Sequence, residues 1–116
     1  MKKIDFETHF ITQEWYDTLA SNPGYPRFER SEEGKLRLFY HPDAGEPFSE
    51  ELVARLLDVD AGRIAAMDAA GIDMALISLT APGVEQLDPL LGSRLARKAN
   101  DALAEACRCH PDRFQG

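Results

Sequence analysis

The chain has 116 residues, which is enough for one domain with a hydrophobic core but not for two. Its 44% hydrophobic content is typical of a globular protein. The net charge of −7 and the lack of a strongly basic stretch argue against nucleic acid and anionic membranes as partners, because both attract clustered Lys and Arg. No apolar run approaches the roughly 20 residues that span a bilayer, and no signal-like apolar core follows Met1, so the cytoplasm is the expected compartment.

Residues 2–10 predict the first strand. Its alternation places Ile4, Phe6 and Thr8 on one face and Asp5, Glu7 and His9 on the other. Glu7 and His9 are two residues apart, so their ends can meet on one cation, which each group binds at about 2.0–2.2 Å. Taken alone, this spacing is more typical of a half-exposed surface strand than of a metal site.

The next segment predicts a short helix and a hairpin. Trp15 and Leu19 share one face of a helix over residues 11–20, and the Pro- and Gly-rich stretch after it cannot continue that helix. Alternating residues then predict strands over 27–30 and 35–40, with Gly34 supplying the positive φ of the turn.

An irregular loop is expected over 41–47, followed by a helix over 50–57 with Ser49 as its N-cap. Asp60 is expected to cap the next helix, along which Ile64, Met67 and Ala70 line one side. Gly71 occupies the position of a C-terminal cap.

The second half predicts a strand, a long helix and the approach to another strand. Residues 72–79 are almost continuously apolar, as in strands buried on both faces of a parallel sheet. Asp88 and Pro89 are in order as N-cap and first residue of a long helix, which Pro111 ends. Residues 112–116 read as the start of a strand that is not completed. The order of elements is that of an α/β protein.

Cys107, Cys109 and His110 together could form a soft metal site, but the two cysteines are more simply interpreted as free thiols. They fall on the long helix, where positions two apart point in different directions. His110 is expected to be a solvated residue at the helix end, stabilised there by the helix dipole.

Four stretches together resemble the N-terminal part of the amidohydrolase-related family, in the branch of γ-resorcylate (2,6-dihydroxybenzoate) decarboxylase, with aminocarboxymuconate-semialdehyde decarboxylase as a more distant relative. These stretches are residues 4–10 (IDFETHF), 63–73, 76–83 (LISLTAPG), and 99–104 together with 110–114 (HPDRF). The resemblance covers residues 2–11 and 58–116 and is weakest over about 13–57, which corresponds to a variable insertion of the branch.

The resemblance implies a single domain over residues 1–116 that is the N-terminal portion of a metal-dependent (β/α)₈ TIM barrel, incomplete in this chain. It also implies a divalent metal, zinc or manganese, with Glu7 and His9 as two of its ligands. The E-x-H form, in place of the more usual H-x-H, points to the resorcylate-type decarboxylases. Such barrels run to about 250 residues, and the family's later ligands, a histidine and an aspartate, have no counterpart here.

The implied reaction is non-oxidative decarboxylation of an aromatic, hydroxybenzoate-type acid. Thr80 follows the second strand at the mouth of the implied barrel and is a candidate for substrate binding, although it fits equally well as the end of a strand. His41, in the insertion, is a weaker candidate for the same role. The aromatic residues of the insertion could wall a substrate pocket, but side chains of this kind more often form a core; they are Trp15, Tyr16, Phe28, Phe39 and Tyr40.

Two alternatives to an active decarboxylase remain open: a non-catalytic fragment that associates, and a metal-dependent hydrolase. Whether the chain is an enzyme therefore also remains open. Two metal ligands do not make a catalytic site, so the chain is expected to be inactive by itself and to associate as a homo-oligomer or as a split-barrel subunit. The other alternative is a metal-dependent hydrolase, since a fold does not fix a reaction. The E-x-H form and the loop over 78–83 favour a decarboxylase.

Overall fold

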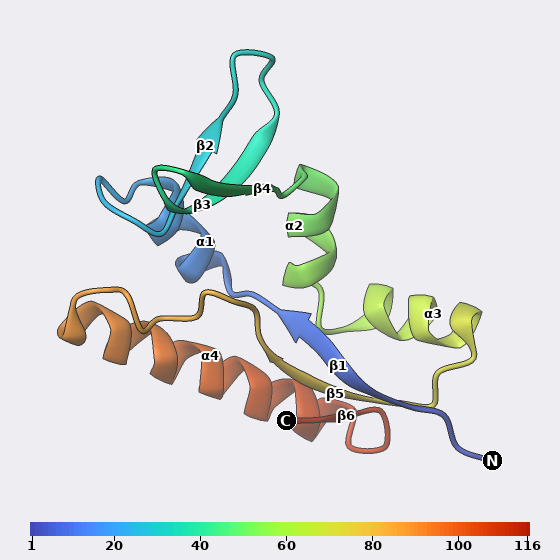
Figure 1. Ribbon diagram of the computed structural model, residues 1–116. Helices are drawn as coiled ribbons and strands as arrows, with labels where there is room; N and C mark the ends of the chain where they lie inside the picture. Colours follow the sequence, from blue (N-terminus) through green and yellow to red (C-terminus); the bar gives the residue numbers. More distant parts are fainter.

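The computed structural model describes residues 1–116 as two three-stranded sheets and four helices (Figure 1). In chain order the elements are β1 (Ile4–Phe10), α1 (Gln13–Ala20), β2 (Arg27–Arg30), β3 (Leu36–His41), β4 (Ala44–Pro47), α2 (Glu50–Leu57), α3 (Ala61–Ala70), β5 (Met74–Leu79), α4 (Pro89–Cys109) and β6 (Phe114–Gln115). None of the helices has both the length and the apolar content that a membrane crossing requires.

The strands β1, β5 and β6 form a parallel sheet in the order β1-β5-β6. We call the face of this sheet that α3 and α4 cover the outer face, and the opposite face the inner face. The outer face holds one hydrophobic cluster, formed by Phe10, Met67, Ala75, Ile77, Ala99, Ala106 and Phe114. The sheet does not close on itself, so the barrel implied by the sequence is incomplete in this chain.

The strand β5 is buried on one face only. Ala75 and Ile77 are buried on the outer face, whereas Ser78 on the inner face is exposed. The prediction that residues 72–79 are buried on both faces is therefore wrong, because no element of the chain covers the inner face. Where the sequence predicted only the start of a strand over 112–116, two residues pair as β6, with Phe114 opposite Ala75.

The strand β1 contains a β-bulge. Asp5 pairs with Ala75 and Thr8 pairs with Ile77, so three steps along β1 match two steps along β5. The Asp5 carboxylate accepts a 3.1 Å hydrogen bond from the N–H of Glu7, inside the bulge. Because the bulge adds one residue, it reverses the faces of the residues that follow it.

This reversal changes which β1 residues share a face. Thr8 lies beside Ile77 on the outer face, whereas Ile4 lies beside Met74 and His9 beside Ser78 on the inner face. The predicted grouping of Ile4, Phe6 and Thr8 on one face is therefore wrong, because strict alternation does not allow for an extra residue.

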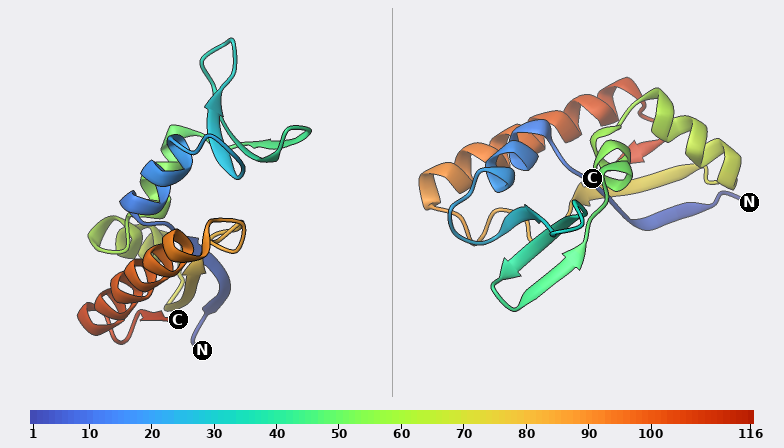
Figure 2. Two further views of the ribbon diagram at one scale, coloured as in Figure 1. Left: turned by 90° about the vertical axis from the view of Figure 1, so that its left-hand side faces the viewer. Right: turned by 90° about the horizontal axis from the view of Figure 1, so that it is seen from above.

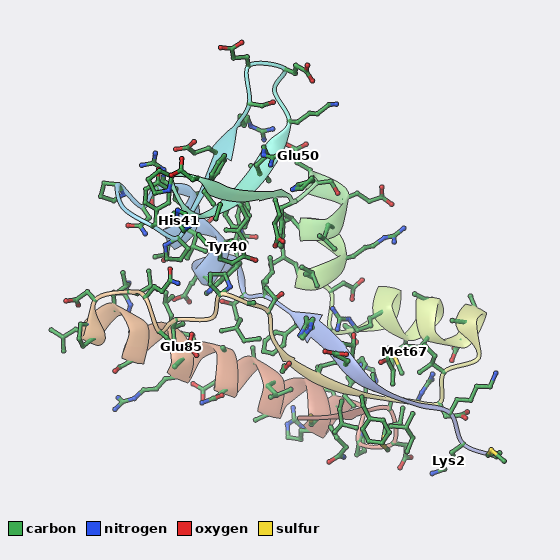
Figure 3. All side chains as sticks on the ribbon, in the orientation of Figure 1. Lys2, Tyr40, His41, Glu50, Met67 and Glu85 are labelled. Atoms are coloured by element: carbon green, nitrogen blue, oxygen red, sulfur yellow. The ribbon has the colours of Figure 1, made fainter.

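Residues 13–57 form most of a second hydrophobic cluster, which projects from the parallel sheet (Figure 2). The buried members are Ile11, Trp15, Leu19, Phe28, Leu36, Leu38, Phe48 and Val53. The predicted hairpin is present as β2 and β3, and Gly34 in its turn has a φ of 79°. Figure 3 shows Tyr40 and His41 on this part of the chain, away from Met67 of the outer-face cluster.

The strand β4 forms where the sequence predicted an irregular loop over 41–47. It pairs antiparallel with β3, and Gly45 lies opposite Phe39. A Cβ atom at Gly45 would come within 2.6 Å of the Phe39 ring, so the missing side chain lets the ring lie against the β4 backbone. The prediction of a loop rested on the Pro- and Gly-rich composition of residues 41–47. It failed because the packing of the Phe39 ring against Gly45 favours a strand there.

The helix ends agree with the predicted caps except at Asp60. Ser49 accepts a hydrogen bond from the N–H of Leu52, and Asp88 accepts from the N–H of Leu90. Gly71 ends α3 with a φ of 70°.

Asp60 precedes α3 but makes no cap with its side chain. Its carboxylate lies 2.7 Å from Nε2 of His110 instead. His110 is therefore not the solvated residue that the sequence predicted, since it joins the end of α4 to the start of α3.

Candidate metal and substrate site

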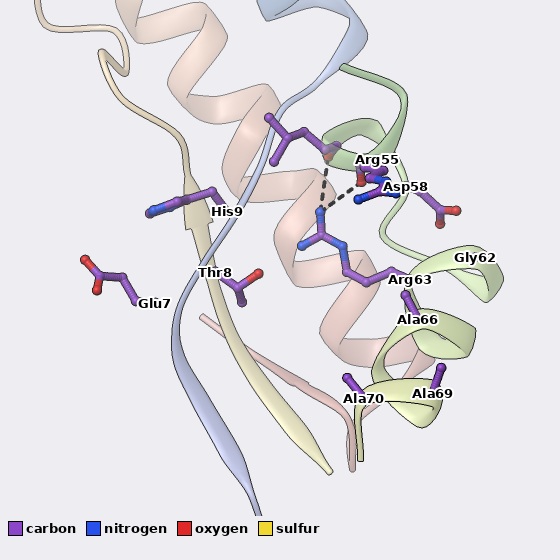
Figure 4. A pocket seen from close by; sticks show the side chains of 11 residues that line it. Glu7, Thr8, His9, Arg55, Asp58, Gly62, Arg63, Ala66, Ala69 and Ala70 are labelled. Atoms are coloured by element: carbon purple, nitrogen blue, oxygen red, sulfur yellow. Dashed lines mark hydrogen bonds between the residues drawn. The ribbon is translucent and has the colours of Figure 1, made fainter. Parts of the chain in front are cut away.

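Glu7 and His9 are the candidate metal ligands, and both follow the bulge in β1. Their side chains leave the strand on the same side, whereas Thr8 points to the other side, toward α3 (Figure 4). Glu7 is exposed and His9 is half-buried. Nothing in the chain covers this side of β1. Further metal ligands from another segment can therefore approach Glu7 and His9 there.

His9 is held by a residue that the sequence analysis did not single out. Its Nδ1 lies 3.1 Å from the hydroxyl oxygen of Ser78, on the neighbouring strand β5. Nε2 of His9 has no hydrogen-bond partner in the chain, which leaves it available to a ligand. The signal that could have identified Ser78 is its chemistry, since it is the one polar residue of β5.

A hollow of about 770 Å³ runs along the free edge of β1. Glu7, Thr8 and His9 line it from the strand, and Arg55, Leu56, Asp58, Gly62, Arg63, Ala66, Ala69 and Ala70 line it from the α2–α3 side. In a closed barrel each strand pairs with a neighbouring strand on both edges. The hollow therefore lies at the edge of β1 that has no neighbouring strand in this chain.

Arg63 is a half-buried charged group of this hollow. Its Nη2 donates to the carbonyl oxygen of Arg55 at 3.2 Å, and its buried Nη1 has no partner (Figure 4). Burial lowers the pKa of the Arg63 guanidinium, and the nearby carboxylate of Asp58 partly opposes this effect. Arg63 therefore ties α3 to the end of α2 and keeps one donor free.

Thr80 lies directly after β5, at the carboxyl end of the parallel strands, which is also the end of β1 that carries His9. Its N–H donates to the carbonyl oxygen of Phe10 at 3.1 Å and extends the pairing of β1 with β5. The amide is therefore already used, and the Thr80 hydroxyl is the group that remains for a substrate.

His41 is not brought together with Glu7 and His9. It lies at the end of β3, is exposed, and accepts a 3.2 Å hydrogen bond on Nδ1 from the N–H of Asp43. It does not line the hollow beside β1. Within this chain His41 is therefore a residue of the β3–β4 turn.

The aromatic residues of segment 13–57 mainly form the core of that segment. Trp15 is 1% exposed and Phe28 is 5% exposed, and their rings meet edge to face with centroids 5.9 Å apart. Tyr16 and Tyr40 pack against the same cluster.

A metal ion would find two donors at this site. No group of three or more His, Cys, Asp and Glu side chains in the chain is arranged so that it could hold a metal ion. Glu7 supplies a carboxylate oxygen and His9 an imidazole nitrogen, a pair that suits zinc and manganese. Cys107 and Cys109 are free thiols on α4. The residues fit part of a coordination shell, and a complete one needs groups from outside the 116 residues.

No protein-family model matches the chain. A γ-resorcylate decarboxylase of Polaromonas sp. is 36% identical over 115 residues, which cover 98% of this chain and 29% of that protein. A γ-resorcylate decarboxylase of Rhodococcus jostii is 44% identical over 68 residues, covering 58% of this chain and 21% of the relative.

Solved structures agree with this comparison. A 5-carboxyvanillate decarboxylase of Novosphingobium aromaticivorans, with bound manganese and 3-methoxy-4-hydroxy-5-nitrobenzoic acid, superposes with a TM-score of 0.73 at 35% identity, over 99% of this chain and 33% of that one. The chain is homologous to these decarboxylases. A dihydroxybenzoic acid decarboxylase of Polaromonas sp., with bound manganese and 2-nitroresorcinol, superposes with a TM-score of 0.66 at 35% identity, over 99% of this chain and 29% of the other.

The chain spans about a third of the length of these homologous decarboxylases. It aligns with part of their TIM barrels, which agrees with its open parallel sheet.

Proposed function

We propose that residues 1–116 provide the first part of a metal-dependent barrel that decarboxylates an aromatic, hydroxybenzoate-type acid, and that they are inactive alone. Glu7 and His9 are two of the metal ligands in this proposal. Residues 13–57 are an insertion beside the mouth of the barrel. Metal-dependent hydrolysis on the same fold is the less favoured reaction, because the homologues named above are decarboxylases.

The observation that carries the proposal is the shared direction of Glu7 and His9 on a strand of a decarboxylase homologue. Two such structures hold manganese together with an aromatic ligand. In this chain Glu7 and His9 lie toward the carboxyl end of β1, and active sites of (β/α)₈ barrels lie at that end of the strands.

A divalent metal at this position supplies a Lewis acid for the carboxylate and hydroxyl oxygens of the substrate. Glu7 and His9 bind it from one strand, so they fix its place relative to the mouth. In this proposal the Thr80 hydroxyl, at the end of the next strand, orients a polar group of the acid. Decarboxylation releases carbon dioxide and places a proton on the ring carbon, and the proposal assigns no residue of 1–116 as the acid that donates this proton.

Fragment complementation tests this proposal. The chain is co-expressed with the Polaromonas decarboxylase from which the aligned first part has been removed, and loss of 2,6-dihydroxybenzoate is followed. We expect activity from the two pieces together and none from either alone. Glu7→Gln and His9→Ala should abolish it, whereas Glu32→Gln, in the exposed hairpin turn, should leave it unchanged. Activity that survives Glu7→Gln and His9→Ala contradicts their role as ligands.

We also propose that the chain, when alone, forms homo-oligomers through its inner face. Phe6 is 73% exposed and Ile4 is 40% exposed on β1. The accessible surface of 7262 Å² exceeds by roughly 950 Å² that expected for a compact monomer of this mass. A standard interface buries about 800 Å² per partner, so the excess is large enough for one.

Sedimentation velocity tests the association. We expect the wild-type chain to sediment as a dimer or larger species at micromolar concentration. Phe6→Ser should shift it toward the monomer, and Leu90→Ser, which replaces an exposed leucine at the start of α4, should not. A wild-type chain that remains monomeric contradicts the proposal.

A further inference from the structure

The contact between His9 and Ser78 depends on two features of the fold. The parallel register of β1 and β5 places the two residues side by side, with Nδ1 of His9 3.1 Å from Oγ of Ser78. The bulge sets this register, because without the extra residue His9 would share the outer face with Asp5. The Asp5 carboxylate holds the bulge through the N–H of Glu7.

The contact leaves the two nitrogens of the His9 ring in different situations. Nδ1 is engaged by Ser78, whereas Nε2 has no partner in the chain. A neutral imidazole carries a proton on one nitrogen and a lone pair on the other, and only the nitrogen with the lone pair binds a metal. The partner of one nitrogen therefore decides whether the other can be a ligand.

We propose that Ser78 is a positioning residue for His9: its hydroxyl oxygen accepts the Nδ1–H, so that the lone pair of Nε2 faces a divalent cation. This inference rests on the proposed role of His9 as a ligand and names the residue that prepares it. Ser78 does not touch the cation. It orients the ring and selects the tautomer.

The position of Ser78 has a second explanation, which is that an exposed residue on the inner face is polar by chance. That explanation predicts no particular tautomer for His9. The short hydroxymethyl group of serine brings its oxygen to the neighbouring strand without crowding the ring. Threonine keeps that oxygen, whereas alanine removes it and changes little else at an exposed position.

Nitrogen-15 NMR of the metal-free chain tests the tautomer. The chain has three histidines, and the signals of His9 are identified by their loss in His9→Gln. At about pH 8, where an ordinary imidazole is neutral, we expect His9 to carry its proton mainly on Nδ1. Ser78→Ala should shift it toward the Nε2–H form, and Ser78→Thr should restore the wild-type state. The signals of His41 and His110 should not move.

Manganese titration, followed by the EPR signal of the free ion, gives an independent readout. We expect Ser78→Ala to weaken binding of Mn²⁺ by about 10- to 100-fold, the usual effect of losing such a partner, and Ser78→Thr to retain it. An unchanged tautomer and unchanged affinity in Ser78→Ala overturn the proposal, as does a wild-type His9 protonated on Nε2.

The two readouts separate this proposal from the proposed function. If Ser78→Ala changes the tautomer but neither His9→Gln nor Glu7→Gln affects Mn²⁺ binding, Ser78 does orient His9, and the assignment of the two ligands is wrong. If manganese binding depends on Glu7 and His9 but not on Ser78, the assignment of the two ligands is supported and the positioning role of Ser78 is overturned.

Discussion

The indole Nε1–H of Trp15 donates a 2.8 Å hydrogen bond to the carbonyl oxygen of Gly83, 68 residues further along the chain. Trp15 belongs to α1, and Gly83 belongs to the loop that follows β5. The indole is 1% exposed, so water does not replace this contact. The bond therefore ties α1 to the loop that begins at Thr80.

Trp15→Phe tests the value of this bond. The substitution keeps an aromatic ring in the cluster but leaves the Gly83 carbonyl without its donor. We expect a loss of about 1–2 kcal/mol in the free energy of unfolding, measured by urea denaturation with circular dichroism. Tyr16→Phe, on the same helix, removes a hydroxyl that makes no hydrogen bond and should change stability by less than about 0.5 kcal/mol. Equal effects of the two variants contradict the prediction.

Arg113, which precedes β6, contacts the end of α3 and the loop that follows it through its guanidinium group. It donates from Nε to the carbonyl oxygen of Asp73 at 2.8 Å and from Nη2 to the carboxylate of Asp68 at 2.7 Å. Lysine donates from one nitrogen and lacks the planar fork that places Nε and Nη2 on two acceptors, so Arg113→Lys should lower the free energy of unfolding by about 1–2 kcal/mol. Arg94→Lys on exposed α4 is the matched control. Thermal unfolding should show a lower midpoint for the first variant only.

Gly71 ends α3 in the left-handed region, with a φ of 70°. A Cβ atom there would meet nothing within 4 Å, so the cost of a side chain comes from the backbone alone. We expect Gly71→Ala to destabilise the chain by about 1 kcal/mol and Gly71→Asn by less, because asparagine tolerates this conformation better. Gly24→Ala, at a glycine without positive φ, should be nearly neutral. A neutral Gly71→Ala would contradict the role of this cap.

Tyr40 is expected to ionise late. Burial, together with a 2.5 Å hydrogen bond to Glu46 and the charge of that residue, raises the pKa of Tyr40 to about 12. The pKa of Tyr40 in the folded chain lies above the ordinary value of about 10. The protonated hydroxyl of Tyr40 therefore contributes fully to the free energy of unfolding below pH 10, and this contribution is lost as the pH rises through 12.

Tyrosinate absorbance measures this directly, because the chain has three tyrosines. Tyr40→Phe should remove the last of the three ionisations, and Glu46→Gln should move it to lower pH. Three tyrosines that ionise together near pH 10 in the wild-type chain would be incompatible with the hydrogen bond.

The sequence predicted most helices and strands because their ends carry local signals. Ser49, Asp88 and Gly71 act within one turn of the backbone, so each can be recognised without knowing the rest of the fold. The parallel pairing of β1 with β5 was implied by the family resemblance, and the homologous structures confirm the barrel-like arrangement.

The features that the sequence did not predict depend on contacts between distant residues. The bulge in β1 is defined only by the pairing of β1 with β5, and the pairing of His110 with Asp60 joins helices 50 residues apart. Ser78 becomes relevant only when it lies beside His9. Composition and periodicity describe one segment at a time, so they do not predict contacts between residues that are far apart in the sequence.

The two hydrophobic clusters have a consequence for the order of folding during synthesis. The second cluster is filled mainly by residues 11–57, which leave the ribosome together. The β1 strand must instead wait for β5, since the contact of Lys3 with Asp73 spans 70 residues. Contacts between near residues form faster than those that close long loops. We therefore expect residues 11–57 to become structured first, and β1 to pair only after β5 has emerged.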